Sequence, residues 1–467
     1  MMVTLQDGTR ETCHDKPLAS GGEGQVYLTT SGTHVVKLYA NPQNWRGQTV
    51  GHIIEKGKGV CADTTWRQLF CWPDGIVTSP CLGVRMPCAD RELVKLGYFL
   101  SPKTLKLIRA GRHPAVQPEV LGTWAGRLGI AIKMARAAGR LHMSGLCHAD
   151  LSENNFIVDP RSGRVALIDL DGLVEEGRLP ATVYGTPRFQ APELVMRQAT
   201  PTCNTDRHAL SVLIYQTLFY GQHPLLRRGT KRRRDIPPSV GEEEERLELG
   251  SRALFIEHPT NAANRPEGPF LSCDVLGPLA ASVARQAFVD GLHDPGKRPM
   301  PAAWEKALVR TADRLLTCPN ARCEGKYFPL PQTGQVRCPW CDALLRHPSP
   351  LPVLHLQQPV RGRTGHFQSD NYLLVVWPDK TLHPWHTDPT KAPGPTIDPT
   401  PVARFACEPS GKWFLCNEQI QGLQTQPGRQ PCRPGDRVEL TDGLRLLLGP
   451  ADSARAAVVQ FVHLQGG

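Results

Sequence analysis

The stretch GLCHADLSENNFIVD, residues 145–159, places acidic and amide side chains directly before a run typical of a β-strand. There Asp150 could accept or orient the proton of an attacking hydroxyl, and Asn155 could bind magnesium through its side-chain oxygen. A second carboxylate ligand is expected just after the following strand, and VALIDLDG offers Asp169 and, two residues on, Asp171. We prefer Asp169 because it directly follows the strand. Phosphoryl transfer mainly requires metal ligands, a carboxylate near the attacking hydroxyl and a cationic group that binds the phosphates.

The cationic clamp and a phosphate-binding loop are expected upstream. Lys37 lies in the apolar strand HVVKLY, where a charge needs a partner. A nucleotide phosphate and a helix glutamate would serve, and Glu55 in GHIIEKGKG is the candidate, with a solvated surface glutamate as the alternative. Residues 18–28, LASGGEGQVYL, form a Gly-rich turn between two predicted strands, in which backbone amides can approach phosphate oxygens. The glycines expected to do so are Gly21, Gly22 and Gly24.

The elements that would position these residues form a two-part α+β domain over about 1–315. Residues 9–39 read as short strands joined by turns, and apolar residues recur at helical spacing from about 126 until Gly145. FIVD and RVALIDL are short strands separated by PRSG, and the pattern over 205–315 is mostly helical.

Seven stretches, in family order, resemble the motifs of the protein-kinase superfamily across about 300 residues of the chain. They are GGEGQVY, VVKLY, HADLSENN, LIDLDG, GTPRFQAPE (185–193), TDRHALSVLIYQTLFYGQHPL (205–225) and HDPGKRPMPAAW (293–304). The resemblance implies a bilobal kinase-like fold, with an N-lobe of about 1–87 and a C-lobe of about 88–315. It also implies that Asp206 braces the catalytic loop and that Arg298 pairs with Glu193.

The resemblance further implies ATP and magnesium as cofactors and assigns roles to the motif residues. Lys37 is expected to clamp the α- and β-phosphates, Asp150 to orient the hydroxyl, and Asn155 and Asp169 to carry the metal. The catalytic residues are thus Asp150, Lys37, Asn155 and Asp169. The nucleotide site is expected to contain Gly21, Gly22, Gly24, Val26, Lys37, Glu55, Met86, Asn155 and Asp169.

Two features favour a protein substrate and transfer to serine or threonine. Small-molecule phosphotransferases share the Asp-to-Asn loop but generally lack the APE and Arg298 motifs, both of which occur here. Thr186 resembles the residue by which Ser/Thr kinases help to position a substrate hydroxyl. The alternatives are a nucleotide-binding pseudokinase scaffold and a small-molecule phosphotransferase.

Four departures from the family pattern keep the pseudokinase alternative open. Ala19 replaces the first loop glycine, Ser152 replaces the lysine that neutralises the transferred phosphoryl group, and DLDG lacks the usual Phe-Gly. Ala149 replaces the arginine that reads a phosphorylated activation segment, so activation by phosphate at Thr182 or Tyr184 is disfavoured.

Two cysteine pairs, in CPNARC and CPWC, predict a closed structural zinc site with four thiolate ligands. The ligands are Cys318, Cys323, Cys338 and Cys341, and the segment 316–345 resembles a zinc ribbon. Its metal would supply folding energy that such a short segment cannot obtain from a core. Fifteen scattered cysteines in all, with only this group regularly spaced, favour a reduced compartment over disulfides.

The last part, 352–467, predicts a small all-β sandwich. It faintly resembles the second half of a forkhead-associated domain around Trp413 and Asn417, and the alternative is a sandwich that binds protein without reading phosphate. A kinase-like domain, a cysteine ribbon and this module together resemble a bacterial group of tellurite-resistance and stress systems. Members of that group occur beside a von Willebrand A-domain protein and a metal-dependent protein phosphatase, which are the implied partners.

Composition excludes some other classes. The net charge is +10, but most of the excess lies in RRGTKRRRD (227–235), which the acidic run GEEEERLE (241–248) follows at once, so a nucleic-acid role is disfavoured. The chain has no long apolar stretch and begins with a polar segment, from which we expect no membrane span and a cytoplasmic location.

Overall fold

The computed structural model divides the chain into two compact units, which differ from the predicted domains. The first contains residues 1–122, 126–272 and 282–305, and the second contains 123–125, 273–281 and 306–467. The predicted boundary near 315 falls within the second unit, which contains both the cysteine segment and the β-rich part. The structure describes residues 1–41, 44–179, 181, 184–226, 238–268, 270–331, 335–346, 350–378, 380–394, 398–450 and 453–464, without the side chains of 44–46 and 238–240.

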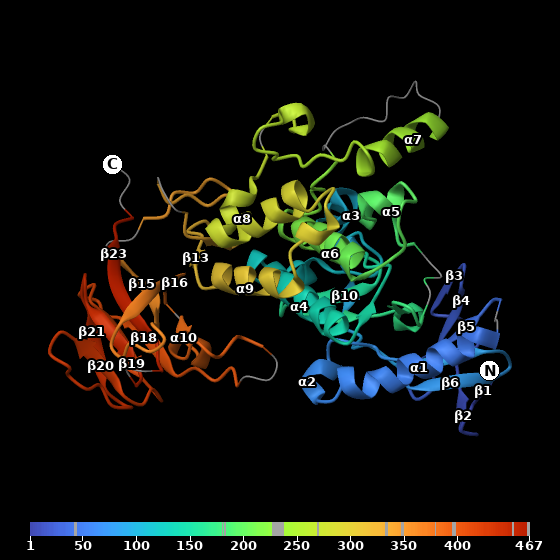
Figure 1. Cartoon of the computed structure of the whole chain (residues 1–467), viewed down its shortest axis with the longest axis horizontal. Helices are drawn as coiled ribbons and strands as arrows, with labels where there is room; N and C mark the ends of the chain where they lie inside the picture. Colours follow the sequence, from blue (N-terminus) through green and yellow to red (C-terminus); the bar gives the residue numbers. More distant parts are fainter. Residues whose placement is uncertain are drawn as a thin grey trace. The chain divides into compact units, whose positions relative to one another are not determined.

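A seven-stranded antiparallel sheet forms the first lobe of the first unit (Figure 1). In order across the sheet the strands are β2 (Arg10–Thr12), β1 (Met2–Leu5), β6 (Gly75–Ser79), β7 (Gly83–Pro87), β5 (His34–Tyr39), β4 (Gly24–Leu28) and β3 (Ala19–Gly21). Side chains alternate along β5, so Val36 and Leu38 enter one apolar cluster and Tyr39 enters another, which also contains Val50 of helix α1 (Asn44–Val60). Lys37 is thus on the same face of the sheet as Tyr39.

Helices form most of the second lobe. Helix α6 (Cys203–Leu218) is almost entirely buried, as expected of a central helix. Thr202 caps its first turn through its side chain. The other helices are α2 (Thr64–Arg67), α3 (Pro102–Arg109), α4 (Trp124–Met143), α5 (Pro192–Val195), α7 (Pro238–Leu249), α8 (Pro278–Arg285) and α9 (Pro301–Ala312). Helices α4, α8 and α9 each contribute residues to both units.

Two small sheets contain strands from the stretch 145–159. Strand β10 (Phe156–Asp159) pairs with β11 (Arg164–Leu167) and with β8 (Val94–Lys95), and β9 (Leu146–Cys147) pairs with β12 (Val174–Glu175). Because β10 and β11 form a hairpin, Asn155 before the first strand and Asp169 after the second lie at the same end of it.

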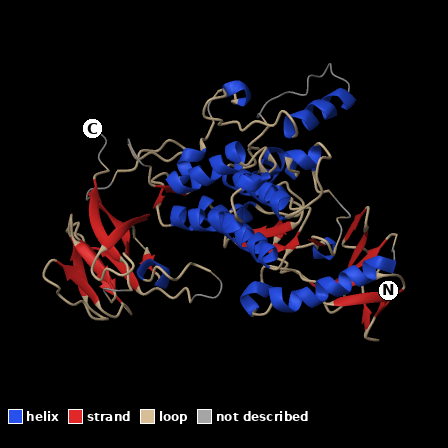
Figure 2. Cartoon of the chain, viewed as in Figure 1, coloured by secondary structure: helices blue, strands red, loops and turns tan. Residues whose placement is uncertain are grey.

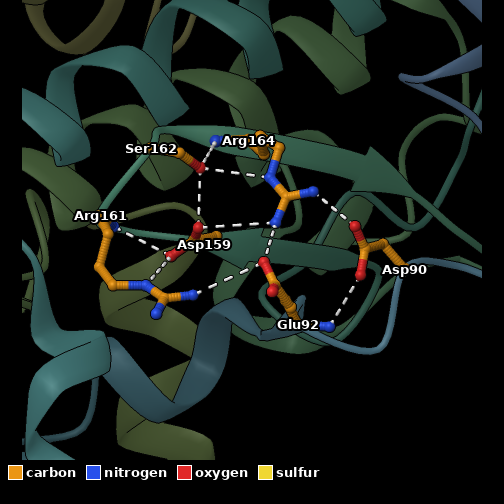
Figure 3. A network of polar contacts seen from close by, with 6 residues as sticks. All are labelled: Asp90, Glu92, Asp159, Arg161, Ser162 and Arg164. Atoms are coloured by element: carbon orange, nitrogen blue, oxygen red, sulfur yellow. Dashed lines mark hydrogen bonds and ion pairs between the residues drawn. The ribbon is translucent and has the colours of Figure 1, made fainter.

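A network of ion pairs fixes the other end of this hairpin (Figure 3). Buried Asp159 accepts hydrogen bonds from the amide and Nε of Arg161, at 3.1 and 2.9 Å, and from Oγ of Ser162 at 2.8 Å. Arg164 extends the network to Asp90 and Glu92, each at 2.5 Å, in the segment between β7 and β8. The network therefore links the segment between β7 and β8, which connects the two lobes, to the β10–β11 hairpin.

Asp159 is expected to contribute to stability in a pH-dependent way. Burial opposes its ionisation, but the hydrogen bonds from Arg161 and Ser162 hold the pKa of Asp159 below its usual value. A lowered folded-state pKa gives stability that is present above the unfolded-state pKa and is lost as pH falls through the folded-state value. We expect Asp159→Asn to lower the free energy of unfolding by about 1–3 kcal/mol at neutral pH, and by less as pH falls below about 4. Urea unfolding at several pH values measures this, and an equal loss at every pH would contradict it.

The second unit contains a short cysteine-bearing hairpin and two antiparallel sheets, drawn as red strands in Figure 2. The hairpin is β13 (Leu315–Thr317) and β14 (Tyr327–Pro329). One sheet has the order β16 (Phe367–Val375), β15 (Leu351–Pro359), β23 (Ala456–Val462), β22 (Arg445–Leu448) and β20 (Leu423–Gln426). The other has β17 (Thr381–Leu382), β18 (Ala403–Cys407), β19 (Trp413–Asn417) and β21 (Arg437–Leu440), with α10 (Pro384–Thr387) after β17.

One apolar core serves the cysteine segment and both sheets, which explains why they form a single unit. It contains Cys338 and Phe328 together with Leu354 of one sheet and Trp413 of the other. Trp124 also belongs to this unit: its ring centroid lies 5.3 Å from that of Trp340, and its amide donates to the carbonyl of Gly325 at 2.9 Å.

Asn417, at the end of β19, braces a turn in the β-rich part. Its Nδ2 donates to the carbonyls of Ile420 and Cys432, and its Oδ1 accepts from the amide of Ile420. The side chain is buried, so its hydrogen-bonding atoms are engaged inside the fold.

Along the described residues, every helix is too short or too polar to cross a lipid bilayer.

Candidate active site

A cleft of about 340 Å³ lies between the Gly-rich turn and the loop that carries His148 and Asp150. Its walls come from the turn joining β3 and β4, from β5, and from the loops that precede β10 and follow β11. The lining residues are Ala19, Ser20, Gly21, Gly22, Glu23, Gly24, Val26, Lys37, His148, Asp150, Asp169 and Gly172.

The glycines of the turn have different reasons for being glycine. A Cβ on Gly24 would lie 2.0 Å from the carbonyl oxygen of Leu38, so β4 and β5 can pair there only without a side chain. A Cβ on Gly21 or Gly22 would meet open space. Their absence of a side chain therefore keeps the cleft open and the backbone amides accessible to a ligand.

Lys37 binds three carboxylates. Its Nζ lies 2.8 Å from Oε2 of Glu23, 2.7 Å from Oδ1 of Asp169 and 3.1 Å from Asp171. The hydroxyl of Tyr39 donates to Oδ2 of Asp171 at 2.7 Å. Burial disfavours the ammonium, but Asp171, Asp169 and Glu23 raise the pKa of Lys37 well above its ordinary value, so the side chain stays charged.

The two neighbouring aspartates differ in exposure. The side chain of Asp169 is 43% exposed and lines the cleft, whereas that of Asp171 is 1% exposed. Burial raises the pKa of Asp169 and Lys37 opposes it. Burial acts in the same sense on Asp171, yet Lys37 and Tyr39 hold the pKa of Asp171 below its usual value. Asp169 is accordingly the carboxylate that a ligand in the cleft can reach.

The predicted pair of Glu55 with Lys37 does not form. Glu55 is 68% exposed and binds Lys58 at 2.5 Å. Instead, the side chains of His52 and Lys56 of α1 bind Glu175 of the second lobe at 2.6 and 2.7 Å. Glu55 precedes Lys56 by one residue, which turns it about 100° away around the helix.

Asp150 and Asn155 lie together beside the cleft. Nδ2 of Asn155 donates to the carbonyl of Asp150 at 2.8 Å and to its Oδ2 at 3.1 Å. The other carboxylate oxygen, Oδ1, accepts from the amide and the hydroxyl of Thr186 at 2.6 and 2.8 Å. The carboxylate is thus oriented from both sides.

Asp206 of α6 holds the loop that carries Asp150. Its carboxylate accepts from the amides of His148 and Ala149 at 2.7 and 3.1 Å, and contacts Nε2 of His142 at 3.1 Å. Ala149 has a φ of 65°, a left-handed conformation that costs free energy and needs such support. The ring of His148 contacts the carbonyl of Ile168 at 3.1 Å, which connects this loop to Asp169.

A buried ion pair fixes the segment after Thr186. Arg298 donates through NH1 and NH2 to the two carboxylate oxygens of Glu193, both at 2.7 Å. Such a two-point contact sets orientation as well as distance.

The remaining predicted residues are placed as follows. Met86 packs with Tyr39, Val50 and Val84 in the apolar cluster of the first lobe. Ser152 is fully buried. Tyr184 is 48% exposed, and Thr182 lies outside the described residues, as does the whole basic run 227–235.

Glu23, Tyr39 and the pairing of Asp171 with Lys37 were not predicted from the sequence. Tyr39 follows Lys37 by two residues in one strand, so alternation alone would have put both on one face. Glu23 is the charged residue of a turn otherwise made of glycines, a signal that could have been used. Which carboxylates meet Lys37 depends on the tertiary fold.

The four predicted zinc ligands form a compact group in the second unit. Sγ of Cys318 lies 3.5 Å from that of Cys341, and Sγ of Cys323 lies 3.7 Å from that of Cys338. All four sulfur atoms lie within 4.8 Å of one another. Four thiolates at about 2.3 Å from a tetrahedral zinc ion are separated by roughly 3.8 Å, so the group fits zinc.

The family described as "Protein kinase domain" matches residues 121–243, which include Asp150, Asn155, Asp169 and Asp206. "Protein kinase YegI" of Escherichia coli O157:H7 is 25% identical over 360 residues, covering 73% of this chain and 50% of that protein. "Protein kinase MCK1" of Saccharomyces cerevisiae is 29% identical over 222 residues, covering 42% of this chain and 53% of that protein. The chain thus spans about half the length of these relatives.

Among solved structures, "ROP18 kinase domain in complex with AMP-PNP and sucrose" is similar over 67% of this chain and 83% of that one, with 18% identity and a TM-score of 0.43. Residues 121–243 are thus similar to a protein kinase domain, and longer parts of the chain are similar to the two named protein kinases.

Proposed function

We propose that this kinase-like chain transfers the γ-phosphoryl group of ATP to serine or threonine of a protein substrate, in a bacterial signalling or stress-response system of the cytoplasm. The observation that carries the proposal is the convergence of Lys37, Asp150 and Asp169 on one cleft roofed by a Gly-rich turn. These residues come from distant parts of the sequence, and their contacts support the roles proposed for them.

Each residue has a role that its contacts support. Lys37 is charged and faces the cleft, where it would bind phosphate oxygens. Asp150 is oriented by Thr186 and Asn155, so its carboxylate would receive or align the proton of the attacking hydroxyl. Asp169 and Asn155 offer oxygen ligands for magnesium, which would neutralise charge on the phosphates.

The proposed specificity rests on two contacts. Thr186 donates to Asp150 and would align an incoming serine or threonine hydroxyl. The pair of Arg298 with Glu193 stabilises the segment after Thr186, and a polypeptide substrate would lie against that segment. A small-molecule phosphotransferase would not need the pair of Arg298 with Glu193 to support a polypeptide substrate.

We assign the second unit a binding role. A zinc ion held by Cys318, Cys323, Cys338 and Cys341 would stabilise it, and its β-rich part would bring a protein partner to the kinase. The engaged side chain of Asn417 favours a module that binds protein without reading phosphate. By family resemblance, a von Willebrand A-domain protein and a metal-dependent protein phosphatase are candidate partners.

The pseudokinase alternative is favoured by one specific observation. At Ser152 the family has a lysine that neutralises the transferred phosphoryl group, and here a short uncharged side chain is fully buried. Loss of that charge would slow transfer, because catalysis of phosphoryl transfer is largely electrostatic.

The deciding experiment supplies ATP labelled on its γ-phosphate to the whole chain with and without magnesium, together with generic protein acceptors and a metabolite mixture. Magnesium-dependent label on serine or threonine is the expected result. Label on metabolites alone would indicate a small-molecule phosphotransferase. A saturable thermal shift with ATP but no transfer would indicate a pseudokinase.

A further inference from the structure

The turn between β3 and β4 carries a carboxylate into the cleft. Oε2 of Glu23 contacts Nζ of Lys37 at 2.8 Å, and Glu23 lines the cleft beside Gly21 and Gly22. Its side chain is 37% exposed, compared with 9% for that of Lys37. Glu23 is therefore one of two partners of Lys37 that face the cleft, the other being Asp169, whose side chain is 43% exposed.

Lys37 does not require Glu23 for its charge balance. Asp171 lies on the enclosed side of the ammonium and is itself held by the hydroxyl of Tyr39. Asp169 is a second partner. The carboxylate oxygens of Glu23, Asp169 and Asp171 lie within 4.8 Å of one another, so this group carries more negative than positive charge.

The number of donors on Lys37 sets a limit. An ammonium has three N–H donors, and here three carboxylates accept from them. A phosphate oxygen can therefore bind Lys37 only if one carboxylate leaves. Asp171 is enclosed and tied to Tyr39, and Asp169 is expected to stay and bind the metal. Glu23, which is 37% exposed and sits on the turn, is the remaining carboxylate.

We infer that Glu23 holds the place of a nucleotide phosphate on Lys37, and that a nucleoside triphosphate binds by displacing it and moving the turn. This inference rests on the proposed nucleotide site. Phosphate and Glu23 repel each other, so a nucleotide without a divalent cation is disfavoured most, and Glu23 makes the site selective for the metal complex.

Nucleotide titrations of the whole chain test this inference. Glu23→Gln removes the charge and keeps the shape, and we expect it to lower the Kd for ATP roughly three- to tenfold, with the larger gain in the absence of magnesium. Glu11→Gln is the matched control, because Glu11 pairs with Arg85 in the same lobe at 2.6 Å and should leave Kd unchanged.

The outcomes separate this inference from the proposed function. Binding by the wild type with no gain in Glu23→Gln would overturn the displacement of Glu23 alone. Binding by neither protein would overturn the nucleotide site as well. Binding by Glu23→Gln and not by the wild type would be the strongest form of the expected result.

A second inference concerns two thiols beside the loop that carries Asp150. Cys147 ends β9, directly before His148, and Cys203 is the first residue of α6. Sγ of Cys203 donates to the carbonyl of Leu146 at 3.7 Å, and Cys203 packs against the buried cluster of Cys147, Ala149 and Val174.

Cys203 has the properties of a reactive thiol. It is partly exposed and lies at the N-terminus of a 16-residue helix, where backbone amides favour a thiolate. The contact with Cys147 lowers the pKa of Cys203 to about 7; burial and Asp206 oppose this, while His142 and Arg207 assist it. The partner thiol, Cys147, is buried.

The geometry points to a reversible disulfide between Cys203 and Cys147, formed with a peroxide as oxidant. The Cys203 thiolate attacks one oxygen of hydrogen peroxide, giving a sulfenic acid and hydroxide. The thiol of Cys147 then displaces that hydroxyl group, which leaves as water once protonated, and the disulfide forms. Asp206 lies one turn after Cys203 and holds the amides of His148 and Ala149, so the new bond would shift the loop relative to its brace.

Peptide mapping after treatment with hydrogen peroxide and trapping of free thiols tests the assignment. We expect a cross-linked peptide joining positions 147 and 203 that dithiothreitol reverses, and its absence in Cys203→Ser. Cys416→Ser, a partly exposed cysteine of the β-rich part, should still form the cross-link. Recovery of both thiols in alkylated form after peroxide would overturn the proposal.

Discussion

Asp150→Asn is expected to lower the rate of phosphoryl transfer roughly 10²- to 10⁴-fold while the protein remains folded. The asparagine retains an oxygen to accept from the amide and hydroxyl of Thr186, which contact Oδ1 of Asp150 at 2.6 and 2.8 Å, and it loses only the contact of Oδ2 with Nδ2 of Asn155. What is lost is the negative charge that would receive or align the proton. Single-turnover transfer of labelled phosphate, together with thermal unfolding, measures the two effects separately.

Glu119→Gln is a suitable control, because this exposed carboxylate lies in the same unit and away from the cleft. It should change neither rate nor stability. Unimpaired transfer by Asp150→Asn would show that Asp150 has no part in the chemistry. A fall in thermal stability would show that the lost rate comes from misfolding.

The second large effect is expected from the four-cysteine group. Structural zinc contributes about 10–16 kcal/mol in small zinc-binding peptides, which is comparable with the total stability of a domain, about 5–15 kcal/mol. Cys338 is 1% exposed and belongs to the core shared by both sheets, so Cys338→Ser should unfold the second unit as well as release zinc. Zinc content and limited proteolysis of the second unit are the measurements.

Cys432→Ser provides the comparison, because Cys432 is buried in the same core but lies outside the group of four. We expect it to retain one zinc ion per chain and a protease-resistant second unit. A second unit that stays folded and zinc-free after treatment with a chelator would show that the cysteines pack without metal.

Local motifs carried most of what could be predicted about the site. Asp150 and Asn155 are five residues apart in one loop, and Asp169 follows the next strand, so their proximity depends on a single hairpin. Lys37 could be identified because a charge in an apolar strand requires a partner. Lys37, Asp150 and Asp169 line one cleft, and Asn155 contacts Asp150 beside it, while the roles of all four stay predictions.

The partners of Lys37 were beyond local reasoning. Glu55 was chosen because it lies on a helix after the strand, but the rotational phase of α1 directs His52 and Lys56, not Glu55, toward the second lobe. Asp171 replaces it from a loop far along the sequence, 134 residues from Lys37. Whether Glu55 or Asp171 pairs with Lys37 depends on how α1 and the loop after β11 pack.

The predicted domain boundaries depend on packing in a similar way, and they stay predictions. Spacing of cysteines and runs of proline suggested three consecutive modules, but burial of apolar surface does not follow sequence order. Once Phe328 and Cys338 enter one core with the two sheets, the cysteine segment has no separate interior.

The composition of the second unit has a consequence for biosynthesis. It draws on residues 123–125 and 273–281 as well as on everything from 306 onward. A ribosome therefore releases Trp124 long before Trp340, the partner of its ring, has been made. The nascent chain must keep that tryptophan from aggregating until the last strands emerge, so a premature stop codon within the second unit would compromise more than the residues it removes.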